Sequence, residues 1–162
     1  MLWASYFINL RIIEVGGFQY ELVSENPITK EKEECIKMHV PKGASLKEED
    51  VRSSIRKSTY EIERYFNVKD INYYIESWLL SPEVLALLDD NSNILKFSKL
   101  FSIKSMGECT RDILDFVFND VYIKDYNLLV CKTSLQVKLK SLLINKKEIH
   151  IGIGKLKQLD QI

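Results

Sequence analysis

The sequence predicts an α+β domain in which a mixed, mostly antiparallel sheet is flanked by helices. Apolar and polar residues alternate from Phe18 to Leu22, which is the period of a half-buried strand. Val51, Ile55 and Ile62 recur instead at the spacing of one helix face. Such segments follow one another in the order β-β-α-β-α-(α or β)-α-α-β, which is typical of a mixed sheet with helices. The 162 residues are expected to form one domain over residues 1–162 with a sizeable core.

The first forty residues are expected to form a hairpin and a further strand. Gly16 and Gly17 break the chain between two extended segments, and Pro41 ends the strand that precedes it. The expected elements are a short helix or its remnant over residues 1–11, strands over 12–15, 18–22 and 35–40, and a hairpin loop over 24–34.

A long helix is expected to begin at Ser45 and to continue to Phe66. Glu48 follows Ser45 by three residues, and this spacing predicts a capping box. In a capping box each of the two side chains accepts a hydrogen bond from the other residue's backbone N–H, so the start of the helix is satisfied internally.

The rest of the chain contains a buried strand, several short elements and a last strand. Aromatic and β-branched residues over 71–80 predict a strand that is buried on both faces. Ser81 and Pro82 are suited to the first positions of a helix, and Thr133 is suited to cap a later one. The segment from Asn93 is either a short helix or a strand. Also expected are an extended segment over 101–103, helical faces over 113–117 and 135–143, and a strand over 149–154.

Charge and hydropathy argue against two classes of partner. The 23 basic and 23 acidic residues cancel, whereas proteins that bind the phosphate backbone of nucleic acids usually carry a basic excess. Apolar runs are too short to cross a bilayer, and the N-terminus lacks the basic start of a signal peptide. We therefore expect a cytoplasmic protein that binds neither nucleic acid nor membrane.

The cysteines and histidines indicate free thiols and no metal centre. The chain has three cysteines, Cys35, Cys109 and Cys131, and no two of them are close in sequence. An odd, scattered set fits a reducing compartment better than a disulfide framework. His39 and His150 are not part of a cluster with metal-ligand spacing, so no metal site is expected.

The segment from His39 to Ser45 is a candidate phosphate site. A helix N-terminus exposes unpaired N–H groups, Gly43 allows a close approach to them, and Lys42 adds a cation. The same segment is also an ordinary connection between a strand and a helix. Acidic residues at 48–50 favour the helix dipole themselves and repel an anion. Both interpretations remain open at this point.

Glu76 is a candidate general base near the end of the predicted 71–80 strand. A carboxylate with a raised pKa can take a proton from a nucleophile. The alternative is a carboxylate at the sheet edge that forms an ion pair with a lysine. Strand alternation places Glu76 and Trp78 on one face and Ser77 on the other.

Five short motifs occur in an order that resembles a known family. These are Gly17-Phe18-Gln19-Tyr20-Glu21-Leu22, His39-Val40-Pro41-Lys42-Gly43-Ala44-Ser45-Leu46, Ser77-Trp78-Leu79-Leu80-Ser81-Pro82, Ser92-Asn93-Ile94-Leu95-Lys96-Phe97 and Thr133-Ser134-Leu135-Gln136. Together they resemble the C-terminal domain of bacterial GNAT-like acyltransferases, which have the acyl-CoA N-acyltransferase fold. The resemblance extends over most of the chain after Ile12.

The resemblance implies a GNAT-like fold, or part of one, and an acyl-CoA ligand such as acetyl-CoA. In such proteins the pantetheine arm lies beside a strand that splays from its neighbour, and the diphosphate lies on the loop that follows. By position, the implied cofactor-binding residues are Met38, Val40, Lys42, Gly43, Ala44 and Ser45. Glu76 and Ser77 would lie on the opposing strand, near the thioester, as the implied catalytic residues.

Two functions follow as expectations. The first is transfer of an acyl group from coenzyme A to an amine. The second is a non-catalytic interaction or regulatory module that keeps the same fold. Related proteins are about twice as long, so the second function would involve pairing with another copy, as a homodimer, or with a separate N-terminal half.

Overall fold

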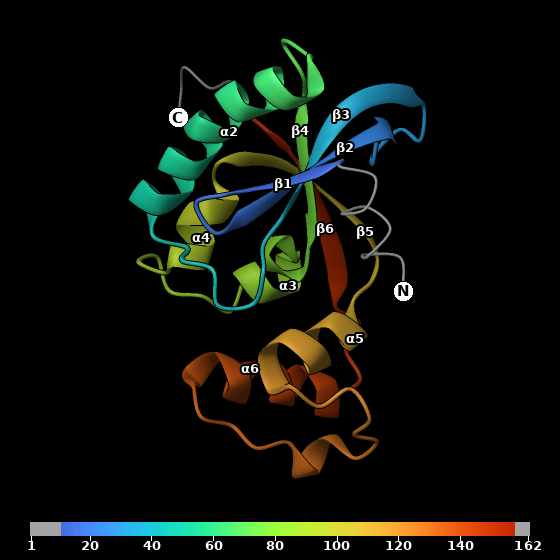
Figure 1. Cartoon of the computed structure of the whole chain (residues 1–162). Helices are drawn as coiled ribbons and strands as arrows, with labels where there is room; N and C mark the ends of the chain where they lie inside the picture. Colours follow the sequence, from blue (N-terminus) through green and yellow to red (C-terminus); the bar gives the residue numbers. More distant parts are fainter. Residues whose placement is uncertain (1–10, 158–162) are drawn as a thin grey trace.

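The computed structural model describes residues 11–157, and it contains a mixed six-stranded sheet (Figure 1). The strand order is β1-β2-β3-β4-β6-β5, and every neighbouring pair is antiparallel except β3 and β4. The strands are β1 (Ile12–Val15), β2 (Phe18–Glu25), β3 (Lys32–His39), β4 (Tyr73–Ser77), β5 (Phe101–Glu108) and β6 (His150–Leu156). The prediction of a mixed, mostly antiparallel α+β sheet is therefore confirmed. The helix expected over residues 1–11 lies, apart from Arg11, outside the described residues.

The first hydrophobic core lies between the sheet and α2 (Glu48–Phe66), with α4 (Asn93–Ser98) on the same side (Figure 1). Tyr20, Met38 and Ile75 point from adjacent strands toward Ile55 of α2, which is fully buried. Burial of this sheet face explains why β2 and β3 show strand alternation in the sequence.

A second hydrophobic core lies at one end of the sheet (Figure 1). It is built from short segments: α3 (Pro82–Leu85), α5 (Thr110–Ile113), the π-helical turn η2 (Leu114–Phe118), the 3₁₀ turn η3 (Tyr126–Leu128) and α6 (Ser134–Ile144). Trp78, at the start of the 3₁₀ turn η1 (Trp78–Leu80), packs against both cores. Gly152 of β6 allows that turn to come close, because a Cβ atom at this position would overlap the main chain of Leu80.

Several predicted boundaries are corrected by the structure. The long helix begins at Glu48, and its N-cap, Lys47, makes no side-chain cap hydrogen bond, so the capping box predicted at Ser45 is wrong. The strand predicted over residues 71–80 ends at Ser77, and η1 follows it. The hairpin loop is shorter than 24–34, since β2 and β3 extend into that segment. Asn93 begins a helix.

Two predicted caps are present. Ser81 accepts a hydrogen bond from the Val84 N–H and is followed by Pro82 at the first helical position. Thr133 and Gln136 form a reciprocal capping box at the start of α6.

Over residues 11–157, no helix is both long enough and apolar enough to cross a membrane.

Candidate functional site

The parallel strands β3 and β4 separate toward their carboxyl ends. Their register joins Ile36 to Tyr73, Lys37 to Tyr74 and Met38 to Ile75, and it extends no further. Beyond this point β3 continues toward Pro41 and β4 continues into η1. Because the two strands run in the same direction, the segments that follow them meet at the same edge of the sheet.

A pocket of about 270 Å³ lies at this edge, between the separated strands. Its lining comes from both strands, from β2 and from the α5–η2 segment. The lining residues are Gln19, His39, Val40, Pro41, Glu76, Ser77, Trp78, Leu79, Asp112 and Phe116. The structure thus brings three of the predicted site residues, Val40, Glu76 and Ser77, into one pocket.

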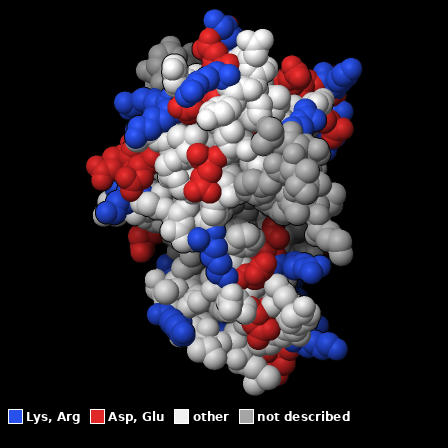
Figure 2. All heavy atoms as spheres, viewed as in Figure 1, with Lys and Arg blue, Asp and Glu red and all other residues white. Residues whose placement is uncertain are grey.

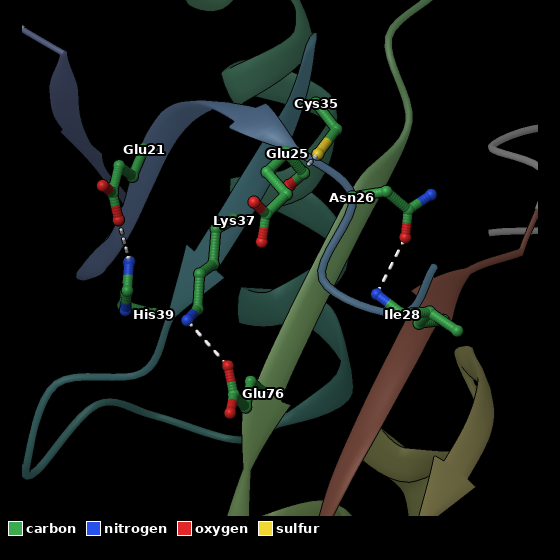
Figure 3. A network of polar contacts seen from close by, with 8 residues as sticks. All are labelled: Glu21, Glu25, Asn26, Ile28, Cys35, Lys37, His39 and Glu76. Carbon is green, nitrogen blue, oxygen red and sulfur yellow. Dashed lines mark hydrogen bonds and ion pairs between the residues drawn. The ribbon is translucent and has the colours of Figure 1, made fainter. Parts of the chain in front are cut away.

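Glu76 lies on the polar face of the sheet, where its carboxylate is paired with an ammonium group (Figure 3). The Nζ atom of Lys37 donates to Oε2 of Glu76 over 2.8 Å. Both side chains are about one third exposed or less, so the pair is accessible to solvent. Of the two interpretations of Glu76, the ion pair with lysine is present, and Glu76 also lines the pocket.

Ser77 has a local structural role as well as a place in the pocket wall. Its Oγ accepts a hydrogen bond from the Leu79 N–H over 3.2 Å and thereby caps η1. This cap turns the chain out of the strand, which explains why β4 stops short of Leu80. A hydroxyl that accepts one hydrogen bond can still donate its proton elsewhere.

A second polar pair lies beside the first. Nε2 of His39 is 2.8 Å from Oε2 of Glu21, and both residues point to the same sheet face as Lys37 and Glu76 (Figure 3). Glu21 is largely buried, whereas His39 also lines the pocket. The pocket therefore combines an apolar wall, which includes Val40, Trp78 and Phe116, with two charged or polar pairs on the sheet face.

Asp112 is a pocket residue that the sequence analysis missed. It lies on α5, four residues before Phe116, and both side chains face the pocket. Burial, followed by the nearby negative charges of Glu76 and Asp115, raises the pKa of Asp112 above its usual value. A short helix far from β4 in sequence gave no signal that this carboxylate would lie near Glu76.

The predicted cofactor-binding residues divide between the pocket, the core and the loop. Val40 lines the pocket, but Met38 is buried in the first core, on the face toward α2. Lys42 reaches across to η2, where its ammonium group donates to Oδ1 of Asn119 over 2.7 Å and to the Asp115 carbonyl over 3.2 Å. Lys42 thus joins the loop to the second core.

The backbone around Gly43 is open. Gly43 has a φ angle of +86°, and a Cβ atom at this position would meet no atom within 4 Å. The Ala44 N–H donates to the Pro41 carbonyl, and the hydroxyl of Ser45 donates to the Asp50 carboxylate. Within residues 11–157, the N–H of Gly43 donates to no protein acceptor.

The loop leads to a second, shallower pocket of about 490 Å³ at the start of α2. Lys47, Glu48, Glu49, Arg52, Asn93 and Lys96 line it. The N-cap of α2 makes no side-chain hydrogen bond, so the first N–H groups of this long helix keep their capacity to bind an anion. Three cations face that end, although Arg52 also forms an ion pair with Glu48 at 2.7 Å. The candidate anion site therefore extends beyond the predicted residues 42–45.

Acidic and basic side chains are interspersed in small groups on the face shown in Figure 2. This distribution agrees with the zero net charge of the whole chain. Among the described residues, no group of three or more His, Cys, Asp and Glu side chains is arranged to hold a metal ion.

Solved structures with a similar fold are acyltransferases in complex with coenzyme A derivatives. One, an acyltransferase in complex with decanoyl-CoA, is 21% identical, has a TM-score of 0.80, and matches 95% of this chain and 48% of its own. Another, in complex with CoA and 10C-teicoplanin, is 21% identical, has a TM-score of 0.80, and matches 96% of this chain and 49% of its own. This chain therefore spans about half the length of those acyltransferases.

The fold is thus that of GNAT-like acyltransferases. The profile of the GNAT-like C-terminal domain matches residues 12–156, and the chain belongs to this family. The resemblance inferred from the short motifs is confirmed. A comparison with curated protein sequences found no match.

Proposed function

We propose that this domain binds an acyl-CoA thioester and takes part in transfer of its acyl group to an amine. The observation that carries the proposal is the pocket at the point where the parallel strands β3 and β4 separate. Membership of the GNAT-like family supports the proposal, as do the acyl-CoA complexes of proteins with the same fold. Acetyl-CoA and longer acyl-CoA molecules are the candidate donors.

In this proposal the ligand extends along the loop after β3. The thioester end lies in the pocket beside Val40, and the pantetheine arm lies between the separated strands, beyond the point where the β3–β4 register ends at Met38 and Ile75. The diphosphate lies between Gly43 and the start of α2. There it is bound by main-chain N–H groups and by cations such as Lys47.

The chemistry is aminolysis of a thioester. The amine nitrogen forms a bond with the acyl carbon, the C–S bond breaks, and coenzyme A leaves as a thiolate that takes up one proton. Glu76 is proposed to accept the proton that the amine loses, directly or through a water molecule. Main-chain N–H groups at the strand ends would stabilise the negative charge that develops on the carbonyl oxygen.

Binding is tested by titrating the protein with decanoyl-CoA in a calorimeter. Lys47→Glu should weaken binding about tenfold or more, because it replaces a cation at the diphosphate position with a negative charge. Lys57→Glu is the matched control, since Lys57 is exposed farther along α2 and away from the pocket. The proposal fails if millimolar decanoyl-CoA produces neither heat nor a rise in the melting temperature.

Catalysis is tested with Glu76→Gln, which preserves shape but removes the base. We expect turnover to fall by about 10²-fold or more while the affinity for decanoyl-CoA stays the same. Released coenzyme A is measured by chromatography with a panel of primary amines as acceptors. Turnover equal to that of the wild type would remove Glu76 from the role of base.

The second candidate function, a non-catalytic partner module, is favoured by the length of the acyltransferases that share the fold. They are about twice as long as this chain, so a second copy or a separate N-terminal half would supply the remaining surface. Analytical ultracentrifugation distinguishes this alternative, which requires self-association or a complex.

The three cysteines are free thiols, which supports a reducing, cytoplasmic location as part of the proposal.

A further inference from the structure

The ionisable side chains that line the pocket are biased toward negative charge. They are His39, Glu76 and Asp112, and the lining includes no lysine or arginine. Two lysines close to these carboxylates already have partners. Lys37 is bound to Glu76, and Lys42 is bound to Asn119 and the Asp115 carbonyl on η2.

Asp112 is the pocket carboxylate whose charge is least compensated. Among the described residues, leaving out the side chains at positions 105, 106 and 108, its carboxylate makes no hydrogen bond or salt bridge, although the charge of the neighbouring Arg111 acts on it through space. Burial, Glu76 and Asp115 all raise its pKa. These effects disfavour the ionised form of the Asp112 carboxylate when no cation is near. A cation placed between Asp112 and Glu76 would stabilise that ionised form.

We propose that Asp112, together with Glu76, binds the ammonium group of the acceptor amine. This inference rests on the proposed function and assigns an acceptor-binding residue in the same pocket. Trp78 and Phe116, which line the pocket beside the two carboxylates, contact the carbon skeleton of the acceptor. Asp112 is thus an acceptor-binding residue, distinct from the groups at the start of α2 that hold the acyl donor.

The proton balance of the reaction agrees with two carboxylates in the pocket. An ammonium group must lose one proton before its nitrogen can attack the thioester, and it loses a second as the amide forms. One of the two protons is taken up by the departing thiolate, and the other leaves through the carboxylates to solvent. The products are an amide, free coenzyme A and one proton, with no change in oxidation state.

The test uses Trp78 as a reporter, because it lines the pocket. The chain has two tryptophans, so Trp3→Phe leaves Trp78 as the only one. In this background the fluorescence is titrated with n-hexylamine at pH 7 and, separately, with 1-hexanol, which has the same length and no charge. We expect the amine to bind about tenfold more tightly than the alcohol, as for a charge-assisted contact.

Three variants then assign the preference to one residue. Asp112→Asn should reduce the difference between amine and alcohol to less than about twofold, and Asp112→Glu should restore most of it. Asp90→Asn, which removes a carboxylate from an exposed turn outside the pocket, should leave the difference unchanged. Circular dichroism and the melting temperature verify that each variant is folded.

The outcomes separate this inference from the proposed function. The inference is overturned if the wild type binds both probes equally, if Asp112→Asn preserves the preference, or if Asp90→Asn abolishes it as well. Should Asp112→Asn not fold, Asp112→Ser takes its place as the variant without a carboxylate, and the same loss of preference is expected. Binding of decanoyl-CoA is measured on the same proteins. Its absence defeats the proposed function, whereas its presence without an amine preference defeats only the inference about Asp112.

Discussion

The two hydrophobic cores of the described chain are built in different ways. The core beneath α2 contains fifteen buried residues, most of them from strands of the sheet and from the nineteen-residue helix α2. The core at the end of the sheet contains eight buried residues, most of them from helices and turns of four to eleven residues. Short segments contribute few internal hydrogen bonds and depend on packing for their stability. We therefore expect the second core to be the less stable part of the molecule.

The difference matters because the pocket lies where the two parts meet. Val40 and Glu76 belong to the sheet, whereas Asp112 and Phe116 belong to the α5–η2 segment. Trp78 lines the pocket and packs against both cores. A ligand that contacts both walls would stabilise the weaker core by binding only its folded form.

The largest effect is expected for Gly152→Ala, which acts at the junction itself. The new Cβ atom would overlap the carbonyl group and the Cβ atom of Leu80, and main-chain atoms cannot move aside as a flexible side chain can. We expect the free energy of unfolding to fall by about 3 kcal/mol or more, as measured by urea denaturation. Gly17→Ala is the control, because the space around Gly17 is open and only its backbone angle is strained. Equal effects of the two substitutions would show that the contact with Leu80 is not tight.

Leu139→Ala and Ile55→Ala compare the cores directly, since both side chains are fully buried. Each should lower stability by about 2–5 kcal/mol. Hydrogen exchange followed by mass spectrometry should show that Leu139→Ala speeds exchange mainly over residues 109–149, whereas Ile55→Ala speeds it throughout the sheet. Identical exchange patterns would mean that the two cores open as one cooperative unit.

The smallest effect is expected for Glu83→Gln at the edge of the second core. Glu83 accepts hydrogen bonds from the His150 main-chain N–H, from Ser81 and from the His150 ring. Burial alone would raise the pKa of Glu83, but the hydrogen bonds from His150 and Ser81 outweigh burial and lower it to about 2, from 4.5. The folded-state pKa is depressed, so the stabilisation is complete above about pH 5 and is lost as the pH falls toward 2.

The free energy of unfolding of the wild type should therefore exceed that of Glu83→Gln by about 2 kcal/mol at pH 7. This value allows for the partial exposure of the Glu83 carboxylate. The difference should shrink as the pH falls. Thermal unfolding between pH 2 and pH 7 measures it. Glu148→Gln is the matched control, because Glu148 lies 3.6 Å from the same histidine and is mostly exposed. A difference that does not depend on pH would contradict the assigned pKa of Glu83.

Much of the sheet and of α2 could be predicted because their side chains repeat with a clear period. Alternation from Phe18 to Leu22 and the stripe on α2 report burial of one face, and the Thr133 cap is local chemistry. The end of β4 was missed because apolar residues continue past Ser77, and only the hydroxyl cap on Leu79 turns the chain. Glu76, Ser77 and Val40 were predicted to lie near one another from the resemblance to a family.

Asp112 could not be predicted from local pattern. Its neighbours in the pocket are distant in sequence, and its position depends on a π-helical turn that no simple period reports. The N-terminus of α2 was misplaced by two to three residues because Ser45 and Glu48 have capping-box spacing, whereas the Ser45 hydroxyl bonds Asp50 instead. Long-range packing and competing hydrogen-bond partners therefore set the limits of the prediction.

The parallel pairing of β3 and β4 has a consequence for how this molecule can diversify. Two connections leave the sheet at one rim: the loop through Gly43 and the turn through Trp78. Each can change in length or composition while the hydrogen-bonded ladder behind them is preserved. Under the proposed function, the loop contacts the acyl donor and the turn contacts the acceptor, so descendants could exchange one specificity without rebuilding the other.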